Sequence, residues 1–219
     1  SCQKEESFFF DVQPYHFLTE DRFDALNVEV VAVEGHEPNQ SALNNLKAFL
    51  ESRLHKPKGI TIIQRTVSSP KNNSFTAQDL RDLEDDLRAQ YAQNNNLAAY
   101  IFYADEGYVD DTENAKTLGL AYSSTSMCIF KDAVDANSGG FGQVSEENLE
   151  TAVLIHEFGH VLGLVNNGTP MVQNHEDPNR RGHCDNEDCL MYYASETGEM
   201  LGFLGGGSVP TLDSQCIAD

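Results

Sequence analysis

The chain has 219 residues and a formal net charge of −21, from 14 Lys and Arg against 35 Asp and Glu. This length fits one domain of generous size, and 40 % hydrophobic residues are enough for a buried core, which excludes a wholly disordered chain. The charge argues against nucleic acid as a partner, and no apolar run reaches the roughly 18 residues that a membrane-spanning helix needs.

Strands and helices are predicted to alternate along most of the chain. Residues 1–24 are mixed in character and are interpreted as a tether and N-terminal extension. Apolar or Val-rich segments predict five strands, over residues 26–33, 60–67, 97–103, 118–122 and 126–130. Apolar periodicity and capping residues predict three helices, over residues 40–55, 76–90 and 145–162, while the Gly-containing segment 131–144 is predicted to be a flexible loop. This pattern indicates an α+β fold with a mixed sheet backed by helices.

The third predicted helix contains an HExxH motif, His156-Glu157-Phe158-Gly159-His160. Side chains four residues apart share one face of a helix, so His156 and His160 can bind the same metal ion. Zinc lowers the pKa of a bound water towards about 7, and Glu157 is placed to take its proton as the water attacks a carbonyl group. The alternative is two surface histidines beside an ordinary glutamate, which the amphipathic helical context argues against.

Gly163 extends the motif to HExxHxxG, which resembles the zinc-binding pattern HExxHxxGxxH of the metzincin peptidases. Asn166 stands where that pattern has its third histidine, and an amide oxygen is a poor zinc ligand. His183 precedes Met191 by eight residues in the run HCDNEDCLMY, which resembles the third ligand and Met-turn of matrixins and the HCxxxxCxM run of archaemetzincins.

The resemblance implies that 17 residues, 166–182, are inserted before the third ligand, and that His183 is this ligand. His175 and Asn166 remain alternatives for the same role. Met191 is expected to form an apolar floor beneath the metal. Tyr193 matches the Met-x-Tyr position of astacin-like and serralysin-like members, where the phenol can stabilise the developing oxyanion; packing of the turn is the alternative.

The metzincin resemblance also places a substrate-binding edge strand before the active-site helix. The residues in that position are Leu118, Gly119, Leu120 and Ala121. An ordinary edge strand without a role in substrate binding is the alternative.

Five cysteines bear on the cellular compartment and on the site. Cys2, followed by a polar stretch, resembles the lipidated residue of a mature bacterial lipoprotein, which implies a cell-envelope, cell-surface or secreted protein and membrane attachment only through this residue.

We predict two disulfides, Cys184–Cys189 and Cys128–Cys216. The alternative is zinc at these cysteines as in archaemetzincins, although no CxxC follows here.

Together these features imply a zinc-dependent endopeptidase with one catalytic Zn²⁺, acting as a monomer on protein or peptide substrates. Its single catalytic domain is expected over residues 25–219, with an N-terminal subdomain, 25–164, and a short irregular C-terminal subdomain, 165–219. Two alternatives remain: an inactive surface lipoprotein that keeps the metzincin fold for binding, and a zinc hydrolase of a non-peptide amide.

Overall fold

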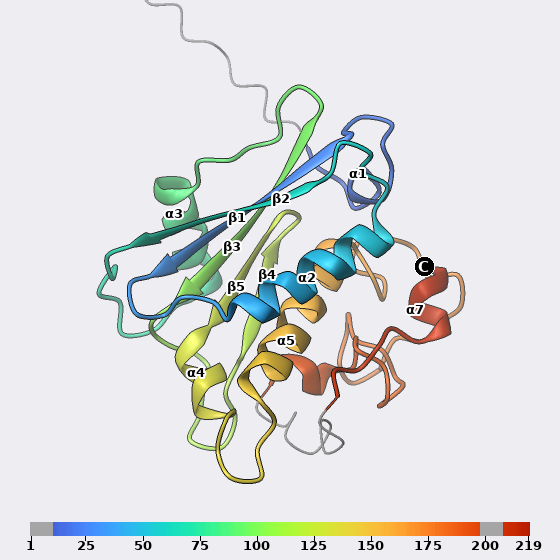
Figure 1. Cartoon of the computed structure of the whole chain (residues 1–219). Coiled ribbons are helices and arrows are strands. Elements are labelled where there is room, and N and C mark those ends of the chain that lie inside the picture. Colours follow the sequence, from blue (N-terminus) through green and yellow to red (C-terminus); the bar gives the residue numbers. More distant parts are fainter. Residues whose placement is uncertain (1–10, 198–207) are drawn as a thin grey trace, which may run out of the picture.

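The computed structural model describes residues 11–197 and 208–219, and its centre is a five-stranded mixed sheet (Figure 1). The strands are β1 (Ala25–Val33), β2 (Ile60–Val67), β3 (Asn96–Ala104), β4 (Gly119–Ser123) and β5 (Ser126–Phe130). Their order is β2-β1-β3-β5-β4; the first four are parallel, and β4 runs antiparallel to β5 at one edge. The predicted α+β fold with a mixed sheet is confirmed.

Helices precede, alternate with and follow the strands along the chain. They are α1 (Tyr15–Leu18), α2 (Gln40–Arg53), α3 (Ala77–Leu87), α4 (Lys131–Ala136), α5 (Glu146–Val161), the 3-10 helix η1 (Tyr193–Glu196) and α7 (Ser214–Ala218). Helices α2 and α5 pack side by side (Figure 1). Within residues 11–197 and 208–219, no helix combines the length and apolar character needed to cross a membrane.

Helices α3 and α5 cover opposite faces of the sheet. Glu29 on β1 accepts hydrogen bonds from the backbone N–H of Ala89, just beyond α3, and it pairs with Tyr100 on β3. Tyr103, also on β3, donates its hydroxyl to Glu150 on α5 at 2.9 Å. Positions three apart in a strand point to opposite faces, so the two contacts place α3 and α5 on different sides. The face under α5 carries the site described below.

The segment after β5 differs from the predicted flexible loop, because its first six residues form α4. Ala133 and Val134 are buried in the core, and the Lys131 amine forms ion pairs with Glu146 at 2.8 Å and Glu150 at 3.3 Å on α5. These long-range contacts hold one and a half turns of helix that are too short to show a clear apolar period. The glycines that suggested a loop lie after Ala136, where the turn to α5 begins.

Part of the predicted tether is packed into the domain. Phe17 and Phe23 are fully buried, and the Phe17 ring meets the edge of Phe158 on α5 at a centroid distance of 5.8 Å. The buried amine of Lys56 donates to the carbonyl oxygens of His16 and Phe23 at 2.7 and 2.8 Å. Residues 11–24 therefore belong to the folded unit, because their aromatic side chains complete its core. The predicted lipid anchor, Cys2, lies outside the described residues.

We expect Phe17→Ala to lower the free energy of unfolding by about 3–5 kcal/mol, as for other buried Phe→Ala changes. The reason is the cavity that it would open between α1 and α5. Chemical denaturation monitored by circular dichroism measures this change. Phe141→Ala is the matched control, because the Phe141 side chain is fully exposed and its removal should leave the unfolding midpoint unchanged. Equal midpoints for the two variants would contradict the packing of residues 11–24.

Candidate metal centre

Helix α5, which carries the HExxH motif, begins and ends at local sequence signals. The Ser145 hydroxyl accepts a hydrogen bond from the N–H of Asn148, and two glutamates occupy the first turn, where the helix dipole favours negative charge. After the last turn, Gly163 adopts a φ of +80°, which turns the chain sharply away from the helix. His156 and His160 consequently lie one turn apart near the C-terminal end of a rigid, buried element.

The structure brings His183 to the same place from the long segment that follows α5. Ligand nitrogens of His156, His160 and His183 all lie within 4.8 Å of one another. The Nε2 atoms of His156 and His160 are 3.1 Å apart, and the His183 ring centroid lies 5.4 and 4.9 Å from those of the two helix histidines. Asn166, the alternative at the expected position, is exposed in the turn after α5, with a φ of +61°. His175, the other alternative, lies elsewhere.

Backbone carbonyl groups orient two of the three imidazoles. The Nδ1 of His156 lies 2.8 Å from the carbonyl oxygen of Leu190, and the Nδ1 of His183 lies 3.2 Å from that of Arg181. A carbonyl oxygen only accepts, so Nδ1 carries the proton in both rings and Nε2 is left with its lone pair. This arrangement is typical of metal-binding histidines, whose second nitrogen is held by an outer hydrogen bond. The three histidines therefore fit a zinc ion with an open fourth position.

Glu157 is buried beside His156, and the edge strand β4 holds it. Its Oε2 accepts a hydrogen bond of 2.7 Å from the backbone N–H of Ala121. Gly119, two residues earlier on the strand, leaves the space that the carboxylate occupies. A Cβ at residue 119 would lie 2.7 Å from Cγ and 2.8 Å from Oε1 of Glu157. The strand thus sets the position of the carboxylate through one hydrogen bond and one missing side chain.

We expect Gly119→Ala to lower the rate of any reaction that depends on Glu157 by about 10²-fold, because a displacement near 1 Å at a catalytic group has this effect. Initial rates at matched zinc content measure it. Gly140→Ala is the control, since its Cβ would meet only the flexible, exposed side chain of Gln143. An unchanged rate in Gly119→Ala would show that the close approach of β4 to Glu157 is not needed.

The residues of the predicted Met-turn pack directly against α5. Met191 is fully buried, and its Sδ would lie only 2.4 Å from a Cβ at Gly159, so the absent side chain at that position admits the thioether. Tyr193 starts η1 and is half-buried, with the Arg180 guanidinium 4.7 Å from its ring centre. The catalytic role of Tyr193 stays a prediction.

A cavity of about 300 Å³ adjoins the histidines. Its lining joins β4 and the turn after it to the end of α5: Pro14, Ala121, Tyr122, Ser123, Ser124, His160, Val161 and Asn167. Of the predicted substrate strand, Leu120 and Ala121 are partly exposed, whereas Leu118 and Gly119 are buried. Of these four residues, only Ala121 lines the cavity.

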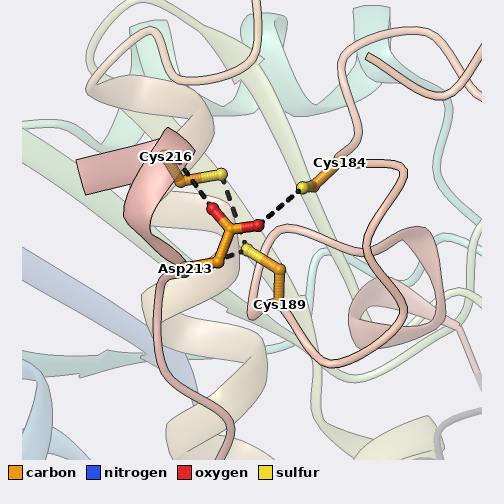
Figure 2. Close-up of side chains that lie close together, drawn as sticks. All are labelled: Cys184, Cys189, Asp213 and Cys216. Carbon is orange, nitrogen blue, oxygen red and sulfur yellow. Dashed lines mark hydrogen bonds between the residues drawn. The ribbon is translucent and has the colours of Figure 1, made fainter. Parts of the chain in front are cut away.

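Figure 2 shows a second group of metal-ligand side chains, which come from the segment after α5 and from α7. Ligand atoms of Cys184, Cys189, Asp213 and Cys216 fall within 4.8 Å of one another, and three of these four residues are buried. Cys189 Sγ lies 3.5 Å from Cys216 Sγ, and Cys184 Sγ lies 3.5 Å from Asp213 Oδ2. We call this group the cysteine cluster. Three soft sulfur donors at these separations suit Zn²⁺.

The cysteine cluster favours the thiolate form of Cys189. Hydrogen bonding from Cys184, and then from Cys216, lowers the pKa of Cys189 to about 3, and the contact with Cys189 raises the pKa of Cys184 to about 12. The backbone N–H groups of Met191 and Asp213 also point at Cys189 Sγ, each at 3.4 Å. Because the thiolate is the metal-binding form of cysteine, these donors prepare Cys189 as a ligand.

Neither predicted disulfide is present. Cys128, Cys184, Cys189 and Cys216 are all buried free thiols. Cys128 lies on β5 within the sheet, whereas Cys216 on α7 lies in the cysteine cluster. The pairing of Cys128 with Cys216 is therefore wrong for this structure, and Cys184 and Cys189 approach Cys216 and Asp213 rather than closing a loop by themselves.

Comparison with solved structures gives a clear match for the whole fold. The crystal structure of an archaemetzincin from Methanopyrus kandleri superposes with a TM-score of 0.58 and 16 % sequence identity, over 90 % of this chain and 94 % of that one. This chain has the fold of that archaemetzincin. A metalloproteinase-II structure from Bacteroides fragilis aligns at 15 % identity and a TM-score of 0.48, over 95 % of this chain and 53 % of that one. No protein-family model and no curated protein sequence matches.

Within this archaemetzincin fold, sequence reasoning missed the role of Asp213. The sequence after the Met-turn contains no CxxC, and for that reason a metal at the cysteines was expected only as an alternative. Asp213 and Cys216 nevertheless have the spacing of the two cysteines in a CxxC motif, in the run Asp213-Ser214-Gln215-Cys216. The Asp213 carboxylate caps α7 by accepting from the N–H groups of Gln215 and Cys216, which aims Cys216 at the cluster. A search for DxxC would have found this signal.

Proposed function

We propose that this protein is a zinc-dependent endopeptidase. The observation that carries the proposal is the convergence of His156, His160 and His183 beside the buried carboxylate of Glu157. Three neutral imidazoles with an open fourth position form a catalytic zinc site, whereas structural zinc sites are closed by a fourth protein ligand. The metallopeptidase-type fold supports the same conclusion.

Zinc at the three histidines would supply a Lewis acid and lower the pKa of water there to about 7. Glu157 then serves as the general base, because its carboxylate lies next to His156 and is fixed by the Ala121 N–H. It takes the proton of the attacking water and returns it to the leaving amine nitrogen. Glu157 and His156 are fully buried, so this proton transfer takes place away from bulk water.

An extended peptide is the substrate that the surroundings fit. Strand β4 is an edge strand of the sheet, and its Ala121 lines the cavity beside His160. A peptide laid along such an edge gains main-chain hydrogen bonds by strand addition, whatever its sequence. We expect the main chain to bind in this way on both sides of the scissile bond, and such binding would favour endopeptidase over exopeptidase activity.

We further propose that the cysteine cluster holds a second zinc ion with a structural role. This cluster is continuous in sequence with the catalytic residues: Cys184 follows His183, and Cys189 precedes Met191 by two positions. Leu190, between them, provides the carbonyl oxygen that orients His156. A metal at the cysteines would hold the third histidine and the turn under the site in place without touching the substrate.

The proposed function is tested by digesting an unfolded protein such as reduced casein and identifying the new termini by mass spectrometry. We expect internal cleavage that stops when a chelator such as 1,10-phenanthroline removes zinc and returns when zinc is added back. Zinc content before chelation should be two ions per chain, one for each group of ligands.

Two results would contradict the proposal. Protein with full zinc content that leaves casein intact would show that the fold serves binding or acts on a non-peptide amide. Release of terminal residues alone would show an exopeptidase. A heat-unfolded sample of the same preparation controls for a contaminating protease, because a contaminant of different stability would survive the treatment.

A further inference from the structure

The inserted segment 166–182 carries one buried histidine, and this residue lies against the cysteine cluster. His175 is 1 % exposed. Its Nδ1 lies 3.5 Å from the Sγ of Cys184 and 3.9 Å from the Sγ of Cys216. From the sequence, His175 was expected to be a loop residue or an alternative third ligand of the catalytic zinc. Its position beside a separate set of sulfur ligands points to a different role.

Asp219 holds the His175 ring in the orientation that a metal ligand needs. The His175 Nε2 lies 2.7 Å from Oδ2 of Asp219, a carboxylate that is fully buried. The carboxylate accepts the Nε2 proton, so the lone pair of the neutral ring is on Nδ1 and faces the two sulfurs. A carboxylate on one ring nitrogen and a metal on the other is the usual arrangement around zinc-binding histidines.

The separations agree with four ligands around one zinc ion. With Zn–S bonds of about 2.3 Å and Zn–N bonds of about 2.0 to 2.1 Å, a tetrahedral site has S···S edges of about 3.8 Å and S···N edges of about 3.6 Å. The observed edges are 3.5 Å for Cys189–Cys216, 3.5 Å for His175–Cys184 and 3.9 Å for His175–Cys216. These three edges are each within about 0.3 Å of the tetrahedral values, and the three sulfurs lie within 4.8 Å of one another.

Asp213 competes for the same place, because its Oδ2 lies 3.5 Å from Cys184 Sγ, but its carboxylate also accepts three other hydrogen bonds. Oδ1 accepts from the N–H groups of Gln215 and Cys216 at 3.0 and 2.9 Å, and Oδ2 accepts from the Asn186 side-chain amide at 3.0 Å. Binding the metal through Oδ2 would add a fourth negative charge to three thiolates around Zn²⁺. The neutral imidazole of His175 completes the coordination without that charge.

We infer that His175, supplied by the inserted segment, is the fourth protein ligand of the zinc ion at Cys184, Cys189 and Cys216, with Asp219 as the outer carboxylate that orients it. This inference rests on the proposed second zinc. It gives the insertion a structural function, because the segment is then fastened to the third-ligand loop and to α7 at once. Two backbone N–H groups also join the segment to these parts of the chain. Asp185 N–H donates to His175 O at 2.9 Å, and Val172 N–H donates to Asp219 Oδ1 at 2.8 Å.

The test measures zinc at the cysteine cluster without using activity. The full chain carrying His160→Ala, which weakens the catalytic site, is dialysed against a mild chelator so that only the tighter site keeps zinc. X-ray absorption at the zinc edge should then show three sulfurs and one imidazole, the latter by its multiple-scattering signature. His175→Ala should lose this signature, and competition with a chromophoric chelator should show weaker zinc binding.

Matched variants separate the two candidate ligands. His175→Cys should restore tight binding with four sulfurs, and Asp219→Asn should weaken binding by about 10- to 100-fold, as for other outer carboxylates of zinc-bound histidines. Asp213→Asn keeps a side-chain oxygen for capping α7, so it should leave the imidazole signature and the metal in place.

Three outcomes would overturn the inference. The first is an imidazole signature that persists in His175→Ala, and the second is loss of zinc in Asp213→Asn while His175→Ala keeps it. The third is a cysteine cluster that retains no zinc in the His160→Ala chain, which would overturn the proposed second metal as well. Because none of these readouts depends on hydrolysis, they are independent of whether the chain proves to be a peptidase. If His175→Ala fails to fold, the spectrum of the His160→Ala chain and the His175→Cys variant still decide the question.

Discussion

Replacing Glu157 with glutamine is expected to slow peptide hydrolysis by about 10²–10⁴-fold and to leave the zinc content unchanged. The variant loses the proton acceptor but keeps an oxygen that can accept the N–H of Ala121, so the side chain should stay in place. The three histidines are untouched, and they alone hold the catalytic zinc in the proposed site. Initial rates of casein cleavage together with elemental analysis measure both quantities.

Glu147→Gln is the matched control for this experiment, because it makes the same chemical change ten residues earlier on the same helix at an exposed position. It should keep the full rate. A normal rate of hydrolysis by Glu157→Gln would show that Glu157 is not the general base. Loss of one zinc ion per chain in Glu157→Gln would instead show that the carboxylate acts as a ligand of the metal at the three histidines.

The helix with the HExxH motif was predictable because the residues that determine it are close together in sequence. The four-residue spacing of His156 and His160, the capping Ser145 and the turn at Gly163 all act within one element. The five strands were found for the same reason, since β-branched and apolar runs mark them directly. The short helix α4 was missed because contacts from α5, rather than its own periodicity, hold it.

The sequence spacing only partly identifies the third histidine of the metal centre. The distance from His183 to Met191 resembles a known pattern, but the path of the chain over residues 166–182 depends on tertiary contacts that no local pattern encodes. The structure brings His183 to the helix histidines and sends His175 to the cysteine cluster. Both histidines are thus near metal-binding groups, and sequence separation alone does not decide which belongs to which.

The cysteines were misread for a related reason. Pairing two and two is the simplest use of four cysteines, and it overlooked that Asp213 caps α7 and so places Cys216 beside Cys189. All four are buried, but their polar surroundings differ: Cys128 lies among the apolar residues of β5, where burial raises its pKa, whereas Cys189 receives two backbone N–H groups. Unequal environments of this kind distinguish packing thiols from ligand thiols.

His183→Ala should reduce the zinc content from two ions to one per chain and abolish hydrolysis. Two helix histidines offer only two of the three ligands that a catalytic zinc requires, so this site should lose its metal, while the cysteine cluster should keep its own. His55→Ala is the control, because His55 is largely exposed and lies far along the chain from both groups. Elemental analysis after dialysis against a mild chelator counts the ions.

The pattern of loss also tests how the two groups are connected. If His183→Ala keeps one zinc and a normal unfolding midpoint, the cysteine cluster supports the loop without help from the catalytic metal. Loss of both ions would mean that the two sites form cooperatively, since Cys184 and His183 are neighbours on one loop. Retention of both ions would refute His183 as the third ligand, because the catalytic zinc would then have to draw its third protein ligand from another residue.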